Sequence, residues 1–479
     1  MENLALTIIL LPFLGALVTA LSPQRVAKWV ATVFSALAAA AVIALAIGFD
    51  QAGKLAREVD LLSFGQTALM GLTIDRLSVL VCVAVVVLGF LVVAYSTAYL
   101  TDGNREHPHD GRPRYYAFLL LFIGAMAGLV LSSTLVGQLV FFEITGACSW
   151  GLIGYYEKPK ALKSAIKALI ITHIAAIGLY FAAAWLFVDT GSFALTGLAH
   201  LNDGAKIAVF PGILIAAWGK SAQLPLHAWL PDAMEAPTPV SAYLHAASMV
   251  KVGVYLFARA LYSAGAVPEV IGWAGVTMAV VTMVYGFLMY LPQRDMKRLL
   301  AYSTISQLSL IFMALSLSVF GSELAFKGAV AHIFNHAFAK SLFFLVAGAL
   351  SYSCGTRMLP SLRGLLKHTP LLGISFCVAA LSITGVPPFN GFFSKFPIFT
   401  AGFQLSAAHL LLLPLVVIAL IESVASFAWF LRWFGDTTPG EASEAVAKAQ
   451  PVPPAIRFVL VTLIVMCVAS SFIAASWLG

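Results

Sequence analysis

The sequence predicts an all-α polytopic membrane protein with about fourteen transmembrane helices. Of its 479 residues, 61% are hydrophobic and 10% are charged, whereas a soluble domain carries about 25% charged residues. The mean hydropathy is +0.94. This composition excludes a soluble enzyme, a disordered protein and a nucleic-acid-binding protein, because each of these needs more polar or charged surface than the chain can supply.

The spans follow from the apolar segments, since one bilayer crossing needs about 20 mostly apolar residues. We expect helices over residues 3–20, 27–47, 75–100, 114–131, 135–155, 161–187, 206–229, 239–262, 267–291, 297–319, 326–352, 370–400, 405–431 and 456–478. No Lys or Arg precedes the first segment, so we expect a retained helix and not a cleaved signal peptide.

Basic residues divide unevenly between the predicted loops. Loops after odd-numbered spans hold 17 Lys and Arg residues, and loops after even-numbered spans hold only Lys54, Arg57, Lys206, Arg259 and Lys327. Because cytoplasmic loops carry the excess of Lys and Arg, we expect a multi-pass protein of the bacterial inner membrane with both termini periplasmic.

Charged residues inside the spans are the candidate functional residues. A charge at the centre of a bilayer costs about 2.5–3.5 kcal/mol even on the most lenient scale, so such residues need partners or water. The spans contain Glu143, Lys167, Lys220, Lys251, Lys340, Lys395 and Glu422. We interpret the mid-span lysines as an ion path, with Glu143 as the partner of one of them; a static set of ion pairs is the alternative. Lys167 lies near a helix end and is equally compatible with a structural role.

Prolines interrupt two of the spans. Pro225 follows Lys220, and Pro387 and Pro388 precede Lys395. Proline removes a backbone donor, and unwound backbone at membrane depth is tolerated where it lines a cavity. Broken helices at corresponding places in two halves indicate inverted repeats. We therefore expect a single membrane domain over 1–479, with three helices in 1–110, five-helix repeats in 111–262 (spans 4–8) and 263–434 (spans 9–13), and a last helix in 435–479.

Span 11 carries His332, His336 and Lys340 at positions i, i+4 and i+8. These side chains share one helix face over about 12 Å. A proton relay is the favoured interpretation because histidine titrates near neutral pH; a metal-binding pair and structural histidines are alternatives. His245 in span 8 is a weaker relay candidate.

Metal and cofactor motifs are missing from the sequence. The five cysteines form no C-x-x-C pair, and we find no dinucleotide fingerprint, Walker loop or H-E-x-x-H motif. We therefore expect no catalytic residue, no metal and no cofactor in this chain, and we expect any redox chemistry to lie on partner subunits. The acidic, proline-rich stretch 230–239 is compatible with helix capping or with attraction of cations, and we do not count it as a site.

Three long motifs carry a family resemblance: Trp218–Ser241, Arg294–Ser303 and Asn335–Phe343. They resemble the antiporter-like, proton-translocating subunits shared by respiratory complex I, Mrp cation/proton antiporters and membrane-bound hydrogenases. Four further stretches, Met1–Thr7, Asn104–His109, Ser351–Arg357 and Ile421–Phe430, resemble the component D subunits of hydrogenase-4, which belong to formate hydrogenlyase-type complexes.

The resemblance implies a role for each buried charge. Glu143 would pair with Lys220, and Lys251 would be the next relay group. His332, His336 and Lys340 would continue the axis, and Lys395 would lie near its exit. The stretch His173–Ala176 lacks the Arg and Asp of the longest complex I homologue, which implies that a modulating ion pair is lost.

The resemblance also implies partners. The chain would be a subunit of an oxidoreductase complex, beside other antiporter-like subunits and a peripheral arm with nickel–iron hydrogenase, iron–sulfur and formate dehydrogenase subunits. Two alternatives stay open: a complex I or Mrp-type subunit, with proton or sodium as the ion, and a membrane anchor that moves no ions.

Overall fold

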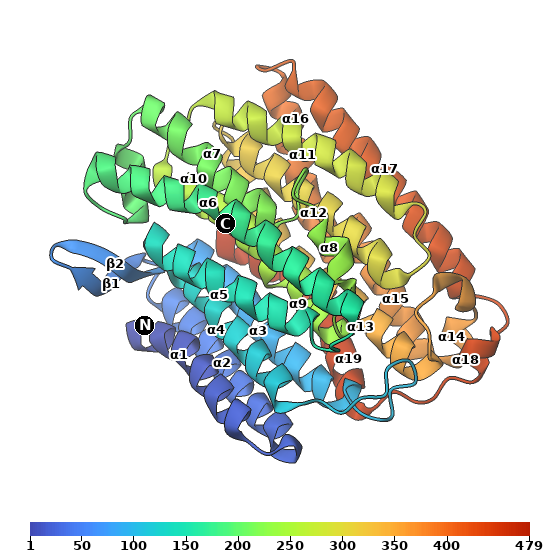
Figure 1. The fold of residues 1–479 in the computed structure, drawn as a ribbon. Coiled ribbons are helices and arrows are strands. Elements are labelled where there is room, and N and C mark those ends of the chain that lie inside the picture. The colour runs from blue at the N-terminus through green and yellow to red at the C-terminus, as the bar shows by residue number, and fades with distance from the viewer.

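Long helices packed side by side make up most of the structure, a computed structural model that describes residues 1–479 (Figure 1). Twelve helical segments are long and apolar enough to cross a membrane. They are α1 (Glu2–Leu21), α2 (Gln24–Gln51), α3 (Arg76–Tyr99), α4 (Pro113–Leu131), α5 (Leu135–Ile153), α6 (Pro159–Thr190), α9 with α10 (Thr238–Ala246 and Met249–Ala264), α11 (Glu269–Tyr290), α12 (Met296–Ser318), α13 (Glu323–Cys354), α17 (Leu412–Thr437) and α19 (Pro454–Leu478).

The two remaining predicted crossings are interrupted helices, as their prolines predict. The first consists of α7 (Asp203–Lys220) and the short α8 (Trp229–Asp232), and the second of α15 (Pro370–Thr384) and α16 (Asn390–Ser406). At the first interruption the Gln223 side-chain amide donates to the Ser221 carbonyl oxygen at 2.9 Å. This bond satisfies a carbonyl group that would otherwise have no helical partner.

A third interruption, between α9 and α10, was not predicted. Ser248 adopts φ −117° and ψ −111°, which ends the helical path, and its hydroxyl donates to the Tyr243 carbonyl oxygen at 2.9 Å. No proline or glycine lies between Tyr243 and Lys251, so the usual sequence signal for a broken helix is missing here.

A β-hairpin between α2 and α3 departs from the all-α prediction. Strand β1 (Arg57–Phe64) pairs antiparallel with β2 (Thr67–Ile74), and the connecting Gly65 has φ +62°. The hairpin projects beyond the helices at one end (Figure 1). Its outer strand is mostly exposed, so no run of apolar residues marks it in the sequence.

Short elements complete the chain: η1 (Leu195–His200), η2 (Ala233–Glu235), η3 (Leu359–Ser361), α14 (Leu365–His368) and α18 (Glu444–Ala447).

The helices differ sharply in burial. The most apolar windows of α9–α10, α12 and α13 are completely buried, whereas those of α1, α2, α17 and α19 are at most 39% buried. The outer helices therefore present apolar side chains outward, as a lipid environment requires, and the inner helices carry the predicted charged residues.

Three basic residues that the sequence analysis assigned to loops are buried within the fold. Lys206 begins α7 and donates to the carbonyl oxygens of Ala264 and Ala266 at 3.1 and 2.6 Å. Arg259 lies in α10, and Lys297 lies in the first turn of α12. The loop assignment is wrong for these residues because each lies inside a helix. Carbonyl or carboxylate groups of the protein are their partners. The orientation of the termini and the division into two five-helix repeats stay predictions.

Candidate functional site

Lys220 is held at the end of α7 by neutral groups of α5. Its Nζ donates to the Phe142 carbonyl oxygen at 3.0 Å and to Thr145 Oγ1 at 3.1 Å. The ammonium also lies 4.3 Å from the centroid of the Phe142 ring, within cation–π range. Lys220 is 1% exposed, so these contacts replace water.

Glu143 does not form the predicted direct pair with Lys220. No Glu143 oxygen lies within 4.0 Å of the Lys220 ammonium, and both carboxylate oxygens lie 3.1 Å from His173 Nδ1 on α6. The stretch that we interpreted as the loss of an ion pair thus supplies a different partner for Glu143. Successive residues of a helix point about 100° apart, so Phe142 and Glu143 face different neighbours.

Lys251 and His336 link α10 to α13. Lys251 Nζ lies 3.0 Å from His336 Nδ1, and both side chains are buried. The interruption after α9 places Lys251 in the first turn of α10. His336 Nε2 is buried and has no hydrogen-bond partner in the protein, so one ring nitrogen faces Lys251 and the other faces no polar group of the chain.

His332 and Lys340, the other two residues of the predicted helix face in span 11, contact α12 and α16. His332 lies between α16 and α12, with Nδ1 2.8 Å from Ser394 Oγ and Nε2 3.3 Å from Gln307 Oε1. Lys340 Nζ donates to Ser303 Oγ at 2.9 Å and to the Leu300 carbonyl oxygen at 3.2 Å.

His245 lies beside α12. Its Nδ1 is 3.1 Å from Thr304 Oγ1, and its Nε2 has no partner. Unlike His336 it contacts no charged residue, and its relay role stays a prediction.

Lys395 and Glu422 occupy the junction of α12, α16 and α17. Lys395 Nζ donates to Ser423 Oγ at 3.1 Å, and Glu422 Oε1 accepts from Ser306 Oγ at 2.6 Å and Ser426 Oγ at 2.7 Å. No Glu422 oxygen lies within 4.0 Å of the Lys395 ammonium. The two opposite charges are thus neighbours that are each held by hydroxyl groups.

A cavity of about 470 Å³ lies beside Lys395. Its wall includes Pro387 from the predicted break, and Phe392 and Phe396 from α16. Lys395 and Phe396, which is 61% exposed, both line this cavity, so it extends from the buried lysine toward the outer surface of α16.

Lys167 forms an ion pair at the periphery of the protein. Its Nζ lies 2.8 Å from Asp232, and Lys160 lies 2.6 Å from Glu235. Both lysines come from α6, so the acidic stretch after α7 is tied to that helix. These contacts favour the structural interpretation of Lys167.

The sequence analysis overlooked the small polar residues of α12. Ser303, Thr304, Ser306, Gln307 and Ser309 face the predicted charged groups or Gln223, whose Oε1 accepts from Ser309 Oγ at 2.7 Å. Five hydroxyl or amide residues within seven positions of a membrane helix indicate that the helix forms hydrogen bonds with its neighbours, so the sequence carried a signal for these residues.

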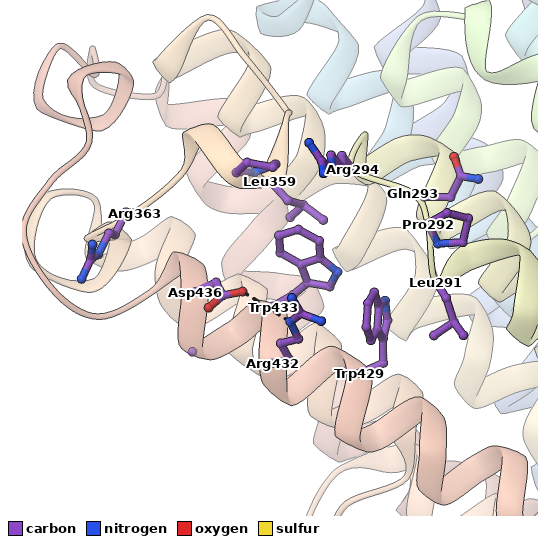
Figure 2. A pocket seen from close by; sticks show the side chains of 12 residues that line it. Leu291, Pro292, Gln293, Arg294, Leu359, Arg363, Trp429, Arg432, Trp433 and Asp436 are labelled. Carbon is purple, nitrogen blue, oxygen red and sulfur yellow. Dashed lines mark ion pairs between the residues drawn. The ribbon is translucent and has the colours of Figure 1, made fainter.

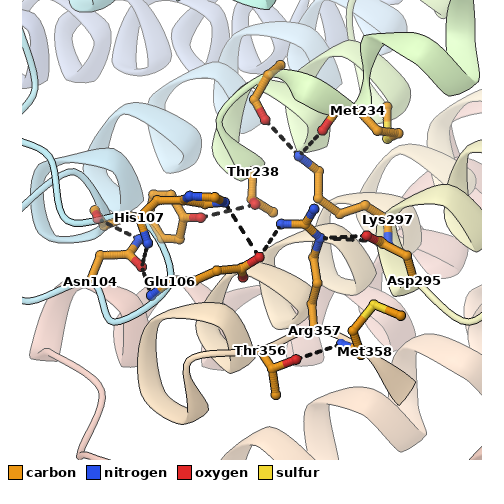
Figure 3. A network of polar contacts seen from close by, with 12 residues as sticks. Asn104, Glu106, His107, Met234, Thr238, Asp295, Lys297, Thr356, Arg357 and Met358 are labelled. Carbon is orange, nitrogen blue, oxygen red and sulfur yellow. Dashed lines mark hydrogen bonds and ion pairs between the residues drawn. The ribbon is translucent and has the colours of Figure 1, made fainter. Parts of the chain in front are cut away.

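The loops at one end of these helices form a separate polar network (Figure 3). Arg357 contacts Glu106 at 2.7 Å and Asp295 at 3.1 Å, while Lys297 Nζ donates to the carbonyl oxygens of Met234 and Ala236 at 2.8 and 2.7 Å. Burial alone would raise the pKa of Glu106, but the hydrogen bond from His107 and the charge of Arg357 lower it to about 2.

No group of three or more His, Cys, Asp or Glu side chains in the chain is arranged to hold a metal ion. The five cysteines are unpaired thiols. That the chain works without a metal or cofactor of its own stays a prediction.

Two family models match the chain. One, described as NADH:quinone oxidoreductase/Mrp antiporter, TM, matches residues 132–421. The other, described as NADH-Ubiquinone oxidoreductase (complex I), chain 5 N-terminus, matches residues 62–116. The first match contains every predicted site residue except Glu422, which directly follows it.

Curated relatives include components of Na(+)/H(+) antiporters. The chain is 36% identical over 393 residues to the A subunit of the Na(+)/H(+) antiporter of Alkalihalophilus pseudofirmus, an alignment that covers 77% of this chain and 48% of that protein. It is 34% identical over 421 residues to the A1 subunit of the Na(+)/H(+) antiporter of Staphylococcus aureus, with coverage of 82% and 52%. The chain therefore spans about half the length of these relatives.

Solved structures agree with these relatives. A chain of the Mrp complex from Dietzia sp. superposes with a TM-score of 0.85 at 30% identity, covering 98% of this chain and 50% of that chain. A chain of the membrane-bound sulfane sulfur reductase, an archaeal respiratory membrane complex, superposes with a TM-score of 0.84 at 26% identity, covering 99% and 95%. The antiporter-like part of the resemblance is confirmed, and the finer assignment to hydrogenase-4 component D stays a prediction. Because the family model covers more than half of the residues, the chain belongs to the NADH:quinone oxidoreductase/Mrp antiporter transmembrane family.

Proposed function

We propose that this chain is an ion-translocating subunit of an Mrp-type cation/proton antiporter assembly in a bacterial inner membrane. The observation that carries the proposal is that four buried mid-span lysines have no carboxylate oxygen within 4.0 Å. Each is held by neutral acceptors: Lys220, Lys251, Lys340 and Lys395.

This arrangement argues against a static set of ion pairs. A structural clamp gains stability when opposite charges are in contact, and breaking such a contact inside a protein costs about 3–5 kcal/mol. A lysine held by carbonyl, hydroxyl or imidazole groups can exchange its proton without breaking an ion pair. Arg259, whose guanidinium touches the Asp75 carboxylate at 2.5 Å, shows what a structural pair looks like in the same protein.

The contact between Lys251 and His336 supports one elementary step. A proton leaves Lys251 Nζ and adds to His336 Nδ1, so the lysine becomes neutral and the imidazole becomes positive. His336 can then release the proton bound to Nε2, its unpartnered nitrogen. The His332 ring lies 5.7 Å away between ring centroids, a separation that one bridging water or a ring rotation closes.

A hydrogenase-4 or formate hydrogenlyase-type complex is the second candidate setting. The four stretches that resemble component D support it, as does the match to nearly the whole chain of a respiratory membrane complex subunit. In that setting nickel, iron–sulfur clusters and formate oxidation belong to partner subunits, and the ion movement is driven by their redox reaction.

The test is ion flux by the purified complex in liposomes, with internal pH and internal sodium recorded together. Proton movement against sodium without a redox substrate is the result expected for an Mrp-type assembly. Proton movement that requires formate or hydrogen, with nickel and iron in the complex, favours the second candidate.

A histidine variant separates transport from anchoring. His336→Ala should reduce flux strongly, while His368→Ala, a control in the short loop helix α14, should leave it unchanged. Absence of flux in the wild-type complex under both driving conditions would support the alternative that the chain is a membrane anchor.

A further inference from the structure

A second cavity, of about 810 Å³, lies at the end of α17, away from the buried lysines (Figure 2). Its wall is formed by the last two turns of α17 and by the loops that follow α11 and α13. The proposed transport uses none of these residues. The lining includes three arginines, Arg294, Arg363 and Arg432, and one acid, Asp436.

The charges in this cavity are unbalanced. Arg432 lies 3.8 Å from Asp436 on the same helix. Arg294 and Arg363 have no carboxylate oxygen within 4.0 Å, and their guanidinium groups donate no hydrogen bond within the chain. All three arginines are exposed, and guanidinium groups match phosphate oxygens with paired, charge-assisted hydrogen bonds, so the cavity can hold an anion of that type.

Two tryptophans also line the cavity. Trp429 and Trp433 lie one helical turn apart on α17, and Nε1 of each is buried without a hydrogen-bond partner. Figure 2 shows both rings at the centre of the cavity wall. Each Nε1 has almost no accessible surface, so the indole N–H groups do not face the cavity, and the two rings form part of its wall.

The position of the cavity indicates where this ligand comes from. The loops that form it follow odd-numbered predicted spans, so the charge bias places it at the cytoplasmic membrane surface. Leu291 lines the cavity, and Leu288, one turn earlier on α11, is 56% exposed. A ligand with an anionic head in the cavity and an apolar tail along this helix fits both features.

We propose that this cavity binds the phosphodiester headgroup of an anionic phospholipid from the predicted cytoplasmic leaflet. Arg294, Arg363 and Arg432 line the cavity that receives the phosphate charge, and the indole rings of Trp429 and Trp433 form part of its wall. The acyl chains lie against the apolar surface of α11. Basic pockets between membrane helices on the cytoplasmic side are suited to such headgroups.

The experiment measures lipid binding to the purified full-length protein in detergent, by native mass spectrometry and by thermal stabilisation. Phosphatidylglycerol is compared with phosphatidylcholine of the same acyl chains and with inorganic phosphate. We expect phosphatidylglycerol to bind about tenfold or more tightly than phosphatidylcholine, because both lipids carry the phosphodiester but the quaternary ammonium of choline is repelled by the three arginines.

Three variants locate the site. The triple change Arg294→Gln, Arg363→Gln and Arg432→Gln should abolish the preference for phosphatidylglycerol. Trp429→Phe with Trp433→Phe keeps an aromatic ring at both positions and all three arginines, so it should leave the preference for phosphatidylglycerol in place. The charge-matched control, Lys158→Gln, Lys163→Gln and Lys448→Gln, should bind like the wild type.

Two results would overturn the proposal. Equal loss of preference in the control and the arginine variant would show that only general surface charge matters. Stabilisation by inorganic phosphate equal to that by phosphatidylglycerol, lost in the arginine variant, would assign the cavity to a free anion and not to a lipid.

Discussion

Asp75 and Arg259 form an ion pair inside the protein, between the start of α3 and the later turns of α10. Both guanidinium Nη atoms contact the carboxylate, at 2.5 and 2.9 Å, and the guanidinium also donates to Tyr255 Oη at 3.0 Å. Asp75 Oδ1 accepts from the Ser78 backbone N–H as the N-cap of α3. This cluster fixes α10, which carries Lys251, against α3.

We predict that Arg259→Met destabilises the protein by about 3–5 kcal/mol, because the Asp75 carboxylate stays buried without its partner. The double change Asp75→Asn with Arg259→Met should recover part of this loss, since no charge is then left uncompensated. Unfolding of the purified protein in detergent measures both. Equal stability of the wild type and Arg259→Met would show that water already compensates this pair.

Lys395 provides a prediction about transport. Lys395→Arg keeps the positive charge beside Ser423, whereas Lys395→Glu places a second carboxylate near Glu422 and reverses the electrostatic effect on the next group of the axis. We therefore expect ion flux to fall much further with Lys395→Glu than with Lys395→Arg. Flux is compared at equal amounts of assembled complex, and equal retention by both variants would mean that Lys395 is only a structural charge.

At the residue scale the sequence predicted which charged side chains are buried better than it predicted the partners of those side chains. Buried charges stand out against an apolar background, which is why Lys220 and Lys251 could be named. The partner of Lys220 is the backbone carbonyl of Phe142 together with Thr145, and no sequence pattern marks a carbonyl oxygen. The pairing of Glu143 with His173 depends on the rotation of α5 relative to α6, which packing decides.

Among the elements, two of the three interrupted helices were predictable because proline removes a backbone donor. The interruption between α9 and α10 depends on Ser248, which bonds to the Tyr243 carbonyl oxygen, and serine is common in continuous helices. The β-hairpin was not predicted because its outer strand is mostly exposed and mixes charged with apolar residues, so no apolar segment marks it. Long apolar segments, in contrast, require helices in a membrane and could be placed.

The loop between α3 and α4 gives a prediction about pH. The pKa of Glu106 is lowered to about 2 from its usual value of 4.5, so its ionised form is stabilised by folding. This contribution is complete above about pH 4.5 and is lost as the pH falls from there to about 2. Thermal unfolding of the wild type should therefore become easier across this range.

The control for this prediction is Glu106→Gln, which cannot titrate. We expect it to be less stable than the wild type near pH 6 by about 1–3 kcal/mol, the cost of leaving charged donors without their acceptor. Its stability should change less than that of the wild type between pH 5 and pH 3. Parallel pH profiles for the two proteins would show that the network in Figure 3 adds no stability through this carboxylate.

In the whole molecule, polar inner helices are enclosed by apolar outer helices. This division follows from composition, since a chain with 10% charged residues has few charges to place and buries several of them in α7, α10, α13 and α16. Partners, the transported ion and the direction of transport are properties of the assembly, so no residue pattern within one chain encodes them. The matches to subunits of larger membrane complexes define which assemblies to isolate.

The most direct test of ion translocation along the buried lysines is flux through liposomes that contain the assembled complex with Lys220→Ala. Lys206→Met is the matched control, because Lys206 is a buried lysine in the first turn of the same helix, and its acceptors, the carbonyl oxygens of Ala264 and Ala266, lie at the end of α10 and in the loop after it. We predict that Lys220→Ala lowers flux to the level of protein-free liposomes while the complex still assembles, and that assembled Lys206→Met transports like the wild type. Wild-type flux in a fully assembled Lys220→Ala complex would contradict the role of these lysines in transport.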